Sequence, residues 1–113
     1  MKLTKKSKEA FEHWYNELPL KFHSDIKGLI YLASSFYRLP LSMQFGVYVD
    51  FFESVGLDVE AIRRAYKRGE DYEWSVLSIE REEVVRSGFS DSRLSAMESA
   101  VSSANDYFNE IVG

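Results

Sequence analysis

The sequence contains no cysteine. This absence excludes disulfide bonds, thiolate metal centres and cysteine nucleophiles. Histidine is scarce as well, because His13 and His23 are the only two and a proline separates them. No serine lies in a Gly-x-Ser-x-Gly elbow, and the glycines are too isolated to form a phosphate-binding loop. We therefore expect neither an enzyme nor a protein that holds a cofactor or a metal.

Long apolar runs are also missing. The longest one, residues 45–52, is interrupted by Asp50 and is too short to span a bilayer. The basic stretch at residues 1–8 is followed by polar and acidic residues, whereas a signal peptide would continue with an apolar segment. We expect no membrane association and a cytoplasmic location.

Excess positive charge is lacking too. Asp and Glu together number 18 against 14 Lys and Arg, which gives a formal net charge of −4. Nucleic acids and anionic membranes normally select positively charged proteins. The composition therefore disfavours a nucleic-acid partner without eliminating it.

What the sequence has in quantity is aromatic side chains, with two Trp, seven Tyr and eight Phe in 113 residues. Each of these side chains buries a large apolar area, so a few of them suffice to build a small core. The length matches one domain, and we expect a single domain over residues 1–113.

Four segments repeat apolar residues at helical spacing, and we predict a helix in each. Pro40 suits the first turn of the third helix, and Gly56 suits the left-handed position just past its end. In the last segment, Ala96 and Ala100 flank the apolar stripe with small side chains that allow close packing on a sheet or a helix. The predicted helices cover residues 4–18, 24–37, 39–55 and 90–111.

Residues 57–79 allow two interpretations. As a β-hairpin that turns at Arg68 and Gly69, they pair Ala65 with Tyr72 and place apolar residues on one face. Charged residues then occupy the other face, where Ile62 is a defect in the alternation. As a helix over residues 58–68, the segment instead ends at Gly69. We predict the hairpin, and hence a mostly helical α+β fold, with an all-α fold as the alternative.

Residues 80–88 are polar apart from Val84 and Val85, and we predict a loop or a short helix there.

The central segment, residues 39–56 (LPLSMQFGVYVDFFESVG), resembles one found in small uncharacterised proteins of tailed phages, notably those of gut Bacteroides. Those proteins often begin with a short helix similar to residues 11–15 and end with one similar to residues 92–110. The present sequence departs from them at residues 19–37, which look like an added helix, and it lacks the proline that usually follows the arginine in the terminal segment. The resemblance implies a phage or mobile-element origin, the host bacterial cytoplasm as location, and a helix, hairpin, helix order. It implies no mechanism.

The strongest local charge feature surrounds the predicted turn. Four cations lie within six residues, with two tyrosines nearby, and such side chains are common in binding surfaces. They are also typical of solvated positions that flank a turn and pair with neighbouring acidic residues. The candidate partner-binding residues are Arg63, Arg64, Tyr66, Lys67, Arg68 and Tyr72.

Two functions follow from these patterns. The leading hypothesis is a small phage or mobile-element module that binds a host or virion protein. The alternative is a nucleic-acid-binding accessory domain that uses the basic cluster at residues 63–68. A homodimer is a secondary expectation, because the third and fourth helices carry more apolar surface than one small domain readily buries.

Overall fold

The computed structural model describes residues 1–18, 36–64 and 71–113 and has an α+β fold. The elements follow in the order α1 (Lys5–Asn16), α4 (Leu41–Ser54), β1 (Leu57–Arg63), β2 (Tyr72–Ser78), β3 (Glu83–Ser90) and α5 (Arg93–Val112). The predicted fold class is confirmed. The all-α alternative is wrong, because the residues assigned there to a helix begin with strand β1.

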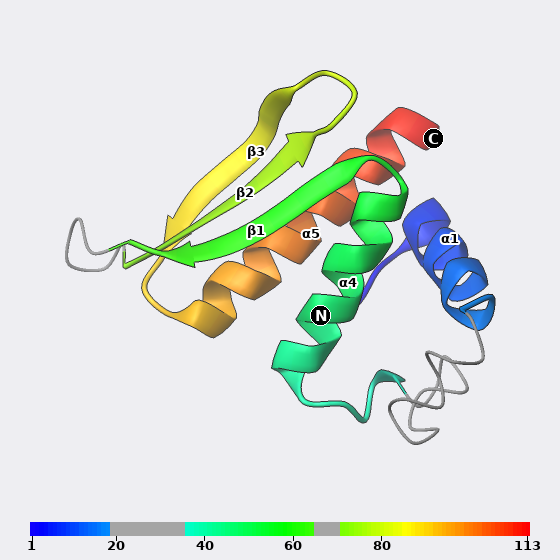
Figure 1. Ribbon diagram of the computed structural model, residues 1–113, viewed down its shortest axis with the longest axis horizontal. Coiled ribbons are helices and arrows are strands. Elements are labelled where there is room, and N and C mark those ends of the chain that lie inside the picture. The colour runs from blue at the N-terminus through cyan, green and yellow to red at the C-terminus, as the bar shows by residue number, and fades with distance from the viewer. Residues whose placement is uncertain (19–35, 65–70) are drawn as a thin grey trace.

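The three strands form one antiparallel sheet in the order β1-β2-β3. Helix α5 lies along one face of this sheet and contacts all three strands, and α4 lies beside it against β1 (Figure 1). Helix α1 packs against α4 and α5, farther from the sheet. Of the described helices, none combines the length and the apolar content that crossing a bilayer requires.

The helices α1, α4 and α5 fall where the sequence predicts helices. Gly56 ends α4 with a φ of +90°, a left-handed conformation that glycine adopts without steric cost. Pro40 occupies the N-cap position, one residue before the first helical residue. The helix predicted over residues 24–37 lies almost entirely outside the described residues.

The hairpin formed by β1 and β2 is confirmed, but its predicted register is wrong by two residues. Arg63 lies opposite Tyr72, and Ala61 lies opposite Trp74, where the prediction paired Ala65 with Tyr72. The turn predicted at Arg68 and Gly69 lies outside the described residues. Since side chains alternate with a period of two, the shift leaves every residue on its predicted face.

The prediction of a loop or short helix over residues 80–88 is wrong, because β3 occupies most of this segment. β3 pairs with β2 and places Gly88 opposite Trp74. A Cβ atom on Gly88 would lie 2.6 Å from the indole ring, so only glycine lets the ring cover the strand. A bulge leaves Val85 without a partner on β2.

An aromatic cluster forms the centre of the core, and Phe11 of α1 lies in its middle. The Phe11 ring centroid is 5.0 Å from that of Tyr48, 5.1 Å from that of Phe36 and 5.4 Å from that of Phe51. These four rings are at most 1% exposed. Tilted and edge-to-face pairs of this kind add to the free energy gained by burial alone.

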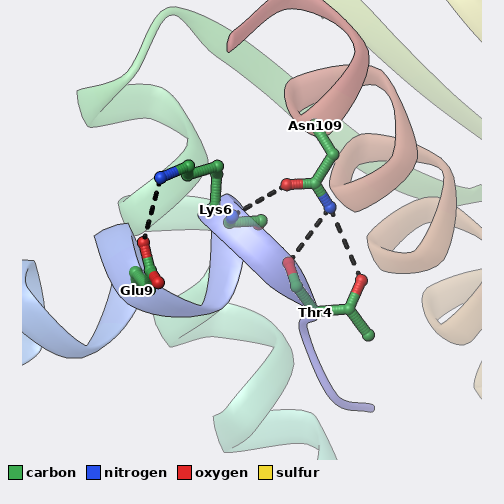
Figure 2. A network of polar contacts seen from close by, with 5 residues as sticks. Thr4, Lys6, Glu9 and Asn109 are labelled. Atoms are coloured by element: carbon green, nitrogen blue, oxygen red, sulfur yellow. Dashed lines mark hydrogen bonds and ion pairs between the residues drawn. The ribbon is translucent and has the colours of Figure 1, made fainter. Parts of the chain in front are cut away.

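The first turn of α1 is held by two asparagines of α5. The Thr4 backbone N–H donates to Asn105 Oδ1 at 2.9 Å, and the Ser7 N–H donates to Asn109 Oδ1 at the same distance. Figure 2 shows the Asn109 amide reaching Thr4, whose carbonyl accepts from Asn109 Nδ2 at 3.0 Å. Thr4 itself makes no side-chain cap. The asparagines therefore replace a local N-cap, and they flank Lys5, whose φ of 55° is unusual for a non-glycine residue.

Two tyrosine hydroxyls are buried in the core. Tyr48 donates its hydroxyl hydrogen to the Met1 carbonyl at 2.8 Å, and burial raises the pKa of Tyr48 far above its usual value. Burial raises the pKa of Tyr15 from 10.0 to about 12. The Tyr15 hydroxyl has no hydrogen-bond partner among the described residues.

We expect replacement of Asn109 by alanine to lower the free energy of unfolding by about 1 kcal/mol, the usual effect of removing a helix cap. Urea unfolding followed by circular dichroism measures the change. Ser102→Ala, at an exposed position of the same helix, is the control and should change little. Equal stabilities for the two variants would contradict a capping role for Asn109.

We expect the free energy of unfolding to fall as the pH rises from 10 to 12. In this range the unfolded chain loses the Tyr15 proton while the folded protein keeps it, because the folded pKa is about 12. Tyr15→Phe removes this contribution, so the variant should lose less stability over the same range. Urea titrations at several pH values test this, and parallel curves for the two proteins would refute it.

Candidate functional site

The outer face of the sheet, opposite α4 and α5, is the candidate functional site. On the inner face, Leu57, Val59 and Val76 are at most 2% exposed. Because side chains alternate along a strand, their neighbours point away from the helices. Four of the outward side chains are large and apolar: Leu77 is half-buried, and Ile62, Val84 and Phe89 are 40%, 54% and 48% exposed. None of the described helices covers this face.

Strand pairing arranges the outer-face residues in three rows that cross the sheet from β1 to β3. Two rows are partly apolar, and the row between them is polar and small. Each row contains one residue from β1, one from β2 and one from β3. The rows are Ile62, Glu73 and Phe89; then Glu60, Ser75 and Ser87; then Asp58, Leu77 and Val84. The apolar side chains of the outer face therefore lie on either side of the polar middle row.

A shallow hollow of about 370 Å³ lies over this polar middle row. Ser75 and Ser87 contribute hydroxyls to it, while Ile62 and Val84 contribute apolar surface. Glu60 and Glu73 line it on the side of β1 and β2. The hollow thus offers apolar contacts and negative charge together, which suits a side chain with an apolar stem and a cationic end.

One ion pair crosses the outer face. Arg64 Nε lies 3.3 Å from Glu73 Oε1, with both side chains partly exposed. Glu60 makes no ion pair with another residue in the described ranges. Of the two carboxylates at the hollow, Glu73 is therefore paired with a cation, whereas Glu60 is paired with none of the described residues.

The predicted partner-binding residues are only partly assembled at this site. Arg64 lines the hollow, but its guanidinium is occupied by Glu73. Arg63 is exposed at the end of β1 and lies opposite the half-buried Tyr72. Alternation along the strands places both residues on the inner face, away from the hollow. The remaining three, Tyr66, Lys67 and Arg68, lie outside the described residues.

Sequence reasoning missed the apolar part of the site. Ile62 is visible in the sequence only as a defect in the polar face of the hairpin, and the structure shows that the defect is an exposed apolar side chain. Val84 and Phe89 belong to β3, which the sequence patterns do not identify. The β-branched pair Val84 and Val85 is the one local signal in the sequence that favours a strand there.

Of the two histidines, only His13 lies in the part of the chain that the structure describes. His13 is exposed on α1, with its Nε2 3.9 Å from Glu17 Oε1. Within residues 1–18, 36–64 and 71–113, no three histidine, aspartate or glutamate side chains lie close enough to hold a metal ion. His23 falls outside these ranges.

Comparison with known proteins gives no relative: no family model, curated protein or solved structure matches the chain. The resemblance of residues 39–56 to proteins of tailed phages therefore stays a prediction. The outer face has to be judged on its own geometry.

We expect the outer-face apolar residues to contribute little to stability. Ile62→Thr and Val84→Thr should each change the free energy of unfolding by less than about 0.5 kcal/mol, as is usual at exposed positions. Val76→Thr is the matched change on the inner face and should cost about 1–3 kcal/mol, because it buries a hydroxyl. Urea unfolding of the three variants tests this, and a loss at Ile62 or Val84 as large as that at Val76 would show that this face is structurally covered.

Proposed function

We propose that the protein is a small interaction module that binds another protein through the outer face of its sheet. The observation that carries this proposal is the exposure of Ile62, Val84 and Phe89 on a face that no described helix covers. Exposed apolar side chains gathered on one face are typical of protein-binding surfaces. The polar residues among them give such a surface the mixed character of a non-obligate interface.

The resemblance of residues 39–56 to proteins of tailed phages supports a more specific form of the proposal. In this form the chain is encoded by a phage or mobile element, acts in the host bacterial cytoplasm, and binds a host or virion protein. The matching segment includes all of α4, a core helix, so the resemblance concerns the scaffold rather than the binding face.

Nucleic-acid binding by residues 63–68 receives less support. Arg64 is paired with Glu73, and Glu60 lies on the same face, so the charge of Arg64 is offset by nearby carboxylates. A phosphate backbone would be repelled by these carboxylates.

We expect the double variant Ile62→Glu, Phe89→Glu to lose its partner while staying folded. The test is affinity capture from a lysate of Bacteroides cells, the host that the resemblance implies, followed by mass spectrometry. Ile111→Glu is the control, because Ile111 is exposed at the end of α5, away from the sheet. Partners bound by the original protein should be retained by the control and lost by the double variant. Capture of the same proteins by all three would contradict binding through this face.

A further inference from the structure

The charge of the outer face restricts what binds there. In the three rows and at Arg64, Asp58, Glu60 and Glu73 contribute three carboxylates against one guanidinium, so these described residues have a formal net charge of −2. The Arg64–Glu73 ion pair leaves the negative charge concentrated on β1, at Asp58 and Glu60. A partner therefore gains most from apolar residues together with positive charge.

Two other occupants are disfavoured by the same charges. A second copy of the chain, packed face to face, would bring its own three carboxylates against these. A nucleic acid or an anionic membrane would meet them with still more negative charge. Like charges brought together across an interface are repulsive, so the face discriminates against all of these.

The width of the face matches one helix. Three strands at the usual spacing of about 4.8 Å span about 10 Å, and a helix with its side chains is about 10–12 Å across. On the inner face, α5 contacts β1, β2 and β3, and α4 lies beside it against β1. On the outer face, the apolar rows at Ile62 and Phe89 and at Leu77 and Val84 offer two lines of contact to such a helix.

We propose that the binding partner presents an amphipathic helix with basic flanks to the outer face; this rests on the proposed function and specifies its partner. The apolar stripe of that helix contacts Ile62, Val84 and Phe89. A lysine or arginine at its edge enters the hollow, where its stem lies along Ile62 and Val84, its charged end pairs with Glu60, and the hydroxyls of Ser75 and Ser87 accept further hydrogen bonds.

Titration of the ¹⁵N-labelled protein, followed by NMR, tests this proposal with defined probes. They are a leucine–lysine amphipathic helical peptide, the matched leucine–glutamate peptide and a double-stranded DNA oligomer. We expect only the leucine–lysine peptide to shift the amide signals of Ser75, Ser87 and their neighbours. Its binding should weaken at high salt, because exposed charges are screened.

Charge reversal separates a specific contact from general attraction to an acidic protein. Glu60→Lys should weaken binding of the leucine–lysine peptide about tenfold, and Glu60→Gln should weaken it by a smaller factor. Glu98→Lys makes the same change in net charge on exposed α5 surface and should leave affinity within about twofold. The NMR spectrum of each variant shows directly whether it is folded.

Several results would overturn the proposal. They are signal shifts confined to the helices, equal losses in Glu60→Lys and Glu98→Lys, or equal binding of the leucine–glutamate peptide or DNA at the outer face. These failures differ from a failure of the proposed function. If the capture experiment still depends on Ile62 and Phe89, the protein is an interaction module whose partner is not a basic helix.

Discussion

Helix α5 contacts every other helix and strand that the structure describes, and its small side chains make this possible. Ala96, Ala100 and Ala104 follow one another at intervals of four residues, and none has any exposed surface. Such a strip lets the backbone of the helix approach the sheet closely, as the sequence analysis predicted for Ala96 and Ala100. Since α5 and α4 lie on the same side of the sheet, no described helix covers the opposite side.

The sequence predicts the fold class and the three described helices, because helices of this length carry a strong periodic signal. The register of the hairpin is harder to predict, since it depends on where the chain turns, and a turn centred on Arg68 and Gly69 gave pairs that differ by two residues from the observed pairing of Arg63 with Tyr72. β3 was missed for a physical reason: its inner face carries Gly88 and Arg86 where alternation would require apolar residues. Gly88 makes room for the Trp74 ring, and that requirement is visible only after the strands are paired.

The candidate site was less predictable than the fold. The sequence draws attention to charge, and it therefore indicated Arg63, Arg64 and their neighbours rather than the apolar surface beside them. An exposed apolar residue and a buried one look alike in a sequence, and only the packing of α5 on one face distinguishes Val76 from Val84. The tethering of α1 by Asn105 and Asn109 was likewise invisible, because those bonds join residues from opposite ends of the chain.

The irregular strand β3 has a consequence for how the protein behaves when it is concentrated. Of the described strands, β3 lies at one edge of the sheet, and open edges are the usual templates for fibril growth. Here the bulge at Val85 interrupts the row of backbone groups, and Arg86 turns inward to Glu110 Oε2 at 2.7 Å. A strand that paired with β3 would meet the bulge in its backbone. It would also have to accommodate the charged side chain of Arg86 on the inner face of the sheet. At the edge formed by β3, the protein therefore displays apolar surface to a partner without offering a continuous row of backbone groups to copies of itself.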